Sequence, residues 1–260
     1  MATLSIPFKQ YRDLEGLNSH YLMDLLRSPV HARFNKEHDE DTDALAFGRA
    51  FHTAVLEPGE LLMRYAAKPD VDARTKAGKA AIAALPQDKE WLSVGDMARI
   101  QGMAAAIRRH KAARELLAGC YAVEQSYTWE MSGLKCKCRV DGIGKGYVVD
   151  LKSTHDASKH AFERDIAKYK YHIQGAHYME GALANQCQVQ EFILIAVEKE
   201  PPFGVAVYRL DEGYLDAARD QIATAFQLHR QCTKANEWPS YPEQVQDVLC
   251  PAWMVSEEYA

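Results

Sequence analysis

The middle of the chain constrains the fold most strongly, because its side chains alternate in the way that β-strands require. Mostly apolar and polar residues alternate in 121–130 and again in 134–141. A turn at 131–133 separates these segments, and Gly142 to Gly146 lead into a third, VVDLKST at 148–154. A period of two is typical of strands, and short connections that contain glycine favour antiparallel pairing. The sequence therefore predicts a three-stranded antiparallel meander.

The rest of the chain is expected to be mainly helical. Asp41 or Thr42 is a candidate N-cap, and Pro58-Gly59 is expected to end the helix that follows it. Helices are predicted at 15–28, 41–57, 72–84, 94–118, 157–184 and 211–233, and two further strands at 191–198 and 204–210. This order predicts one mixed α/β domain over 1–260, with a mainly helical part (1–119), a sheet core (120–210) and a C-terminal helix and tail (211–260).

Composition narrows the class of protein. Apolar residues make up 47% and charged residues 26%, as in ordinary globular proteins, and the formal net charge is −5. The acidic balance argues against a general coating of positive charge for nucleic-acid binding, although it leaves room for a local basic channel. We find no run of about 18 apolar residues and no secretory-signal layout, and the six cysteines form no CxxC pair. These features predict a cytoplasmic protein with reduced thiols and no membrane partner.

Charged residues interrupt the meander at corresponding places. Asp150 and Lys152 project from one face of VVDLKST, and Asp141 and Glu124 lie on the polar faces of the two preceding strands. Close carboxylates require protons or cations to relieve their repulsion, and Mg²⁺ is the usual partner of oxygen ligands. The alternative interpretation of Asp150 and Lys152 is an ion-pair network or simply a solvated sheet face.

These residues also carry a resemblance. VDG at 140–142 followed by DLK at 150–152 is similar to the split motif of the PD-(D/E)xK nuclease superfamily, with Val140 where a proline often stands. FGRAFHTAVLEP (47–58) resembles the helix that supplies a metal-binding histidine in the RecB-like branch, and YHIQGAHYMEG (171–181) resembles the Gln-x-x-x-Tyr helix of that branch. Three more segments resemble RecE-type exonucleases (the nuclease domain of exodeoxyribonuclease VIII): PDVDARTKAGKA (69–80), CKCRVDGI (136–143) and NEWPS (236–240).

The resemblance implies a fold and an activity. The expected fold is a central mixed sheet flanked by helices. The expected activity is Mg²⁺-dependent digestion of linear double-stranded DNA from the 5′ end, which leaves 3′ single strands for recombination, with Mn²⁺ as a substitute metal. Such enzymes form rings, here a trimer or a tetramer, and work with a single-strand annealing protein. Phages and prophages commonly encode them, so the expected location is the cytoplasm of a bacterium or a phage-infected cell.

The resemblance also assigns roles to residues of this sequence. Lys152 is expected to orient or help deprotonate the attacking water. Gln174 and Tyr178, which are four residues apart on one helix face, are expected either to touch the nucleotide near the cut or to cap the site by packing. The implied metal ligands are His52, Asp141, Asp150, the carbonyl of Leu151 and, directly or through water, Glu124. The alternative interpretation of His52 is a core histidine, and that of Glu124 is an exposed strand residue.

Basic residues are candidates for DNA contacts. Those predicted to meet the phosphate backbone are Arg74, Lys76, Lys79 and Arg139, although the first three could equally form a solvated helix face and Arg139 could instead balance the acids. Ser28 or Arg33 is the candidate for holding a 5′ phosphate. Cys232 and Cys250 are too isolated for an iron–sulfur cluster, and no GxxxxGK[ST] pattern for ATP binding occurs.

Two other functions fit the same residues. One is a structure-specific or single-strand nuclease of the same superfamily, which would not depend on a duplex end. The other is a catalytically silent DNA-binding subunit, against which the intact Asp141, Asp150 and Lys152 argue.

Overall fold

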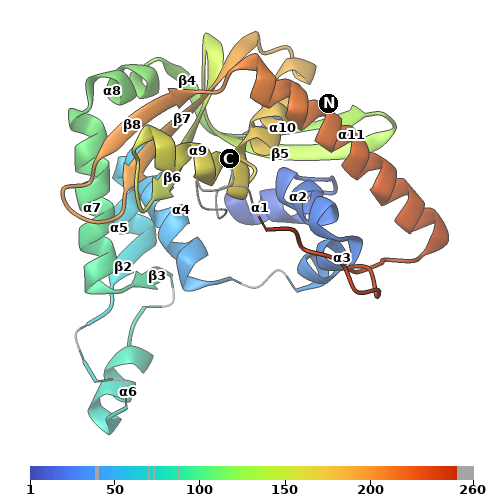
Figure 1. Cartoon of the computed structure of the whole chain (residues 1–260). Helices are drawn as coiled ribbons and strands as arrows, with labels where there is room; N and C mark the ends of the chain where they lie inside the picture. Colours follow the sequence, from blue (N-terminus) through green and yellow to red (C-terminus); the bar gives the residue numbers. More distant parts are fainter. Residues whose placement is uncertain (39–40, 70, 73, 87, 251–260) are drawn as a thin grey trace, which may run out of the picture.

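The computed structural model describes residues 1–38, 41–69, 71–72, 74–86 and 88–250. Within these ranges, a six-stranded sheet forms the centre of the molecule (Figure 1). The strands, in spatial order, are β1 (Ala2–Leu4), β4 (Cys120–Met131), β5 (Leu134–Gly144), β6 (Gly146–Thr154), β7 (Val189–Glu198) and β8 (Val205–Arg209). A second, two-stranded sheet joins β2 (Tyr65–Ala67) to β3 (Glu90–Leu92).

The predicted meander is present in the sheet. Strands β4, β5 and β6 are antiparallel neighbours, as the short connections indicated. Strand β7 then pairs parallel to β6, because the 34 residues between them, 155–188, contain a helical crossover of the kind that parallel strands need. Strand β8 returns antiparallel to β7. The sheet is therefore mixed, as expected.

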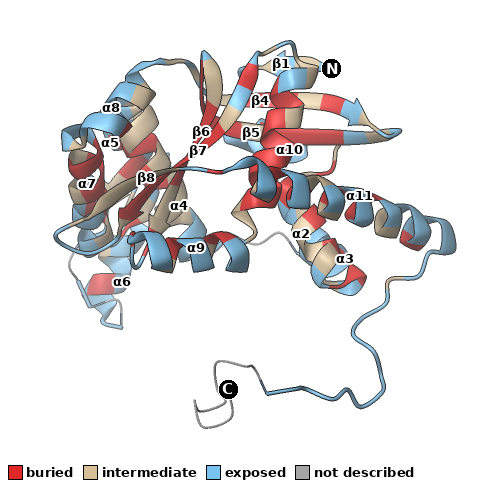
Figure 2. Cartoon of the chain, turned by 45° about the horizontal axis from the view of Figure 1, so that its top comes forward, coloured by how far each residue is buried: buried red, intermediate tan, exposed pale blue. Residues whose placement is uncertain are grey.

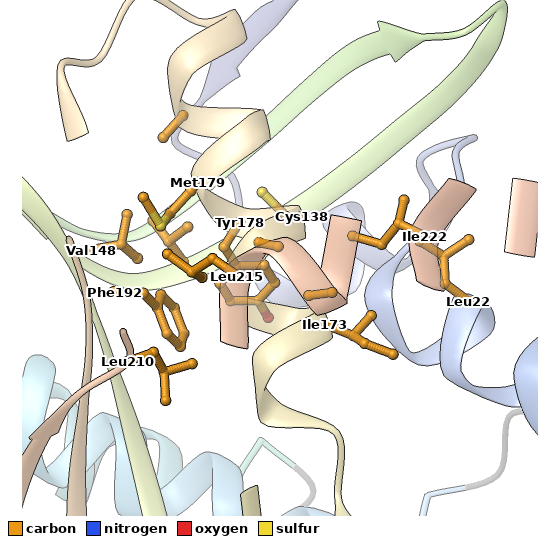
Figure 3. Close-up of a cluster of buried hydrophobic side chains, with 14 of the residues drawn as sticks. Leu22, Cys138, Val148, Ile173, Tyr178, Met179, Phe192, Leu210, Leu215 and Ile222 are labelled. Carbon is orange, nitrogen blue, oxygen red and sulfur yellow. The ribbon is translucent and has the colours of Figure 1, made fainter. Parts of the chain in front are cut away.

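Helices cover both faces of the sheet. On one face, α2 (Ser19–Arg27), α9 (Lys159–Lys168), α10 (Tyr171–Ala184) and α11 (Glu212–Ala235) enclose the first core, around Phe192 and Tyr178 (Figure 3). On the other face, α4 (Asp43–Leu56) and α7 (Val94–Arg109) enclose the second core, around Phe51 and Ile195. Alternate residues of β7 point into each core, so this strand is buried on both sides.

Several boundaries differ from the predicted ones. The helix predicted at 157–184 is two helices, because Lys170 adopts a left-handed conformation (φ 54°) between α9 and α10. The one predicted at 94–118 breaks at His110, whose side chain caps α8 (Lys111–Ala118). Of the two candidate N-caps, Asp41 and Thr42, it is Thr42 that caps α4. Elements that the sequence did not predict are β1, α1 (Phe8–Asp13), α3 (Pro29–Glu37), the 3₁₀ turn Pro58–Glu60, α5 (Leu61–Arg64), β2 and β3.

One part of the described chain lies outside the main layers. Helix α6 (Lys76–Ala83) projects from the body (Figure 1), and most of its residues are exposed (Figure 2). The final ten residues of the predicted C-terminal tail fall outside the described ranges. Among the helices within those ranges, none is both long and apolar enough to cross a bilayer.

Candidate active site

The predicted acidic residues lie where β5 and β6 separate. The last pair before the separation is Gly142↔Val149, whereas β6 remains paired with β7 as far as Thr154. Asp141 and Asp150, the next residues along the two strands, therefore stand at the opening of a fork. We call the group of side chains gathered there the fork site: His52, Glu124, Asp141, Asp150, Lys152 and Gln174.

Glu124 reaches the fork site from β4 through an unusual backbone. It lies opposite Asp141 in the register of β4 and β5, and its φ of 50° is in the left-handed region. A residue other than glycine held there costs about 1–3 kcal/mol, and such residues cluster at functional sites. The guanidinium of Arg139 fixes the carboxylate, because Nε donates to Glu124 Oε2 at 2.6 Å and a terminal nitrogen donates to the Ile6 carbonyl at 2.7 Å.

His52 enters the fork site from α4. Its neighbour Phe51 is buried in the second core, which holds this turn of the helix against the sheet. His52 Nδ1 lies 3.2 Å from Asp141 Oδ1 and 3.9 Å from Glu124 Oε1. One potential ligand atom from each of these three side chains lies within 4.8 Å of the other two. The His52 side chain is 28% exposed, so solvent reaches the group.

Asp150 and Lys152 extend from the same face of β6, as the alternation predicts, and they form the ion pair that the alternative interpretation expects. Gln174 of α10 binds both of them. Its Oε1 accepts from Lys152 Nζ at 2.9 Å, and its Nε2 donates to Asp150 Oδ1 at 3.0 Å and to the Tyr178 hydroxyl at 2.9 Å. Asp150 is only 1% exposed and Gln174 only 7%. This buried amide therefore sets the position of the lysine relative to the acid.

The charges of the fork site compensate one another. Burial raises the pKa of Asp150 to about 6, against the opposing effect of Lys152. Burial and the nearby Asp141 also raise the pKa of Glu124. Burial alone would raise the pKa of Asp141, yet His52 and Lys152 lower it. Burial alone would lower the pKa of His52, yet Asp141 and Glu124 raise it to about 9. Without a cation, a protonated imidazole thus supplies the positive charge that these carboxylates require, and a bound divalent cation would take over that role and leave the imidazole neutral.

The donor atoms suit a divalent cation. Carboxylate oxygens are the preferred protein ligands of Mg²⁺ and Mn²⁺, and a histidine nitrogen completes the group of three. The backbone N–H of Leu151 donates to Asp141 Oδ2 at 2.7 Å. The N–H and C=O of one strand residue point toward the same neighbour, so the Leu151 carbonyl faces the fork as well. Asp150 is turned toward Lys152 and Gln174, and its role as a ligand stays a prediction.

The three residues proposed for DNA contacts that lie away from α6 all have partners within the protein. Arg139 is bound to Glu124 and so matches the alternative that it balances the acids. Ser28 is buried, and its hydroxyl lies 2.6 Å from His31 Nδ1. Arg33 is exposed and pairs with Glu37 at 3.1 Å. None of these contacts tests DNA binding.

The other three predicted DNA contacts lie on or beside the projecting helix α6. Arg74 precedes the helix and pairs with Asp72 at 3.1 Å, and Lys76 and Lys79 are exposed on it. Figure 1 places α6 at the tip of the projection, apart from the sheet. The structure therefore does not bring this basic cluster into the fork site, and its contact with DNA stays a prediction.

Sequence reasoning missed one neighbour of the fork site. The ring of Tyr171 lies beneath Lys152, with the Nζ atom 4.8 Å from the ring centroid. Tyr171, Gln174 and Tyr178 are spaced i, i+3 and i+7, so they share one face of α10. This spacing was visible in the sequence and could have identified the third residue.

Comparisons with known proteins bear on the family and the fold. A model of the family described as "PDDEXK-like domain of unknown function (DUF3799)" matches residues 19–249. The crystal structure of a "putative exonuclease" from Eubacterium rectale superposes with a TM-score of 0.64 at 16% identity, over 93% of this chain and 97% of that one. At this identity the likeness shows the fold alone. The structure of SSO0001 gives a TM-score of 0.37 over 90% of this chain and 86% of that one, at 16% identity.

The search of curated proteins found no match. The comparisons support the superfamily but do not single out the RecE type, which stays a prediction. Because the family model spans residues from α2 past α11, including all of the fork site, the chain belongs to the PDDEXK-like domain family DUF3799, within the PD-(D/E)xK superfamily.

Proposed function

We propose that this protein is a Mg²⁺-dependent exonuclease that digests linear double-stranded DNA from the 5′ end. The observation that carries the proposal is the fork site itself. Two carboxylates and a histidine converge within 4.8 Å, and a lysine held by a buried acid and amide lies on the adjacent strand. Structural ion pairs alone do not require a left-handed glutamate at the same place.

The residues of the fork site would divide the work as follows. His52, Asp141 and Glu124 would hold the divalent cation, together with the Leu151 carbonyl and, as the resemblance implies, Asp150. A cation held there would supply Lewis-acid chemistry, namely polarisation of the scissile phosphate and a lower pKa of a water molecule. The Lys152 ammonium donates hydrogen bonds to the attacking water or to the charge that develops on the phosphate oxygens.

Other residues act by holding these groups in place. Gln174 keeps Lys152 beside Asp150, and Arg139 fixes Glu124. Pre-organisation of this kind matters because misplacing a catalytic group by about 1 Å can cost roughly a hundredfold in rate.

The direction of digestion and the assembly rest on the RecE-type resemblance. Removal of one strand from the 5′ end would leave a 3′ single strand, which an annealing protein could use for recombination. A ring of three or four copies around the duplex would keep the enzyme on its substrate. The annealing protein and the ring of identical copies are both part of the proposal, and so is action on DNA in the cytoplasm.

The test uses a linear duplex labelled at either the 5′ or the 3′ end of one strand, and a closed circle of the same sequence. The proposal predicts early release of the 5′ label from the linear duplex, in Mg²⁺ but not with chelator, and intact circles. Cut circles would favour an endonuclease, such as the structure-specific nuclease of the same superfamily. Binding of DNA without any cleavage would favour a silent DNA-binding subunit.

A further inference from the structure

The turn that joins α9 to α10 holds two tyrosines against each other beside the fork site. The rings of Tyr169 and Tyr171 have centroids 5.6 Å apart and planes inclined by 22°, an offset-stacked arrangement. The ring of Tyr171 also contacts the buried Phe162, with 6.0 Å between the ring centroids, whereas Tyr169 is 48% exposed. The stack thus has one end anchored in the core and one end open to solvent.

The inner ring meets the lysine that is proposed to act on the phosphate. Lys152 Nζ lies 4.8 Å from the centroid of Tyr171, within the range of a cation–π contact. Helix α9 is fastened to the same strand, because the Thr154 hydroxyl donates to Asp165 Oδ2 at 2.8 Å. The open ring of Tyr169 is therefore separated from Lys152 by a single intervening ring.

The conformation of the turn is specific. Lys170, between the two tyrosines, has φ 54° and ψ 41°, a left-handed conformation that a residue with a side chain rarely adopts. Its Nζ donates to the Met23 carbonyl of α2 at 3.4 Å. Strained residues persist where the surrounding structure fixes them, and they cluster at ligand-binding and catalytic sites. Here the left-handed residue brings the rings on either side of it together.

We propose that Tyr169 is a stacking platform for a nucleobase of the strand that is cut, next to the scissile phosphate. The inference rests on the proposed function, because it assigns a further part of the same DNA substrate to this turn. Every base has a π face, so a tyrosine binds bases without regard to sequence, as an exonuclease requires. Lys168 Nζ lies over the ring of Tyr169, 4.9 Å from its centroid, and this exposed side chain would move aside as the base stacks and meet the adjacent phosphate.

The first experiment measures stacking directly and needs no cleavage. The fluorescent base 2-aminopurine, whose emission falls when it stacks, is placed in turn at the first three nucleotides from the 5′ end of a duplex, and these three nucleotides are left unpaired so that stacking within the duplex does not already quench the probe. Binding is followed with chelator present at low salt. The wild-type protein should quench emission at one of these positions. Tyr169→Ala should lose that quenching and bind about 5- to 150-fold more weakly, the equivalent of ~1–3 kcal/mol for one stacked base.

Matched variants separate stacking from folding. Tyr169→Phe retains the ring and should behave as the wild type, and Tyr121→Ala removes a tyrosine that is 61% exposed on β4 and should change nothing. An abasic nucleotide at the quenched position should weaken binding of the wild type but not of Tyr169→Ala, since both changes remove the same contact. Thermal unfolding of all variants confirms that the fold is intact.

The outcomes distinguish this inference from the proposed function. If the wild-type protein cuts linear DNA and Tyr169→Ala binds and quenches as well as the wild type, the platform is refuted and the nuclease proposal stands. If quenching depends on Tyr169 but the protein cuts no DNA, the platform stands and the exonuclease proposal fails. If the wild-type protein quenches at none of the three positions, the platform is refuted whatever the activity.

Discussion

Replacement of Gln174 by leucine tests whether this residue positions the fork site or touches the substrate. The change keeps the volume nearly constant but removes the bond to Lys152 at 2.9 Å and the bond to Asp150 at 3.0 Å. Each is a hydrogen bond to a charged group, with a typical contribution of ~1.5–3 kcal/mol. The remaining ion pair between Asp150 and Lys152 compensates in part, so we expect a loss of about the value of one such bond.

That loss sets the size of the kinetic effect. If it falls on the transition state, ~1.5–3 kcal/mol corresponds to roughly a 10- to 150-fold decrease in kcat, at 1.36 kcal/mol per factor of ten. KM should stay close to the wild-type value, because the amide is only 7% exposed and its three bonds go to protein groups. Steady-state rates on a labelled linear duplex in Mg²⁺ separate the two constants.

Two further variants isolate the individual bonds. Gln174→Glu keeps an acceptor for Lys152 but cannot donate to Asp150, and its added carboxylate should raise the pKa of Asp150 further above 6. Activity should then require a higher pH. Tyr178→Phe removes only a neutral partner of Gln174 and should cost less than tenfold. A Gln174→Leu enzyme with raised KM and intact kcat would refute the positioning role and point to a nucleotide contact.

Two other predictions concern stability and metal binding. His177 is fully buried and burial lowers its pKa to about 4, so the stability present above its ordinary pKa near 6.5 should be lost as pH falls toward 4. Between pH 7.5 and pH 4.5, the free energy of unfolding of the wild type should fall by about 2–3 kcal/mol more than that of His177→Gln. Equal decreases in the two proteins would contradict this assignment. His52→Ala should weaken Mn²⁺ binding in calorimetry by at least the ~10–100-fold that loss of an outer-shell partner costs. Unchanged binding would remove His52 from the ligand set.

The sequence predicted the sheet well, because its signals are local. Alternation and glycine-containing turns define β4, β5 and β6, and the face shared by Asp150 and Lys152 follows from a period of two. The same rule is insufficient at Glu124, where a left-handed residue interrupts the strand geometry. The convergence of Asp141 and Asp150 depends on where β5 and β6 separate, which alternation does not specify.

Long-range contacts explain what the sequence could not predict. Helix α1 is only six residues long, and the Lys137 ammonium donates to three carbonyls at its C-terminal end, those of Tyr11, Arg12 and Leu14. Such a short helix has little stability of its own, so no local pattern marks it. The left-handed conformation of Lys170 could not be predicted from the sequence either, because lysine usually continues a helix.

The most direct test of the central claim is the initial rate at which the protein cleaves linear duplex DNA in Mg²⁺, compared between the wild type, Lys152→Ala and Lys145→Ala. Lys145 is an exposed lysine on the turn between β5 and β6, so it serves as the matched control. We expect the wild type and Lys145→Ala to cleave at equal rates, and Lys152→Ala or added chelator to reduce cleavage at least a hundredfold. Cleavage that survives in Lys152→Ala, or that proceeds equally well with chelator, would show that the fork site is not where the chemistry occurs.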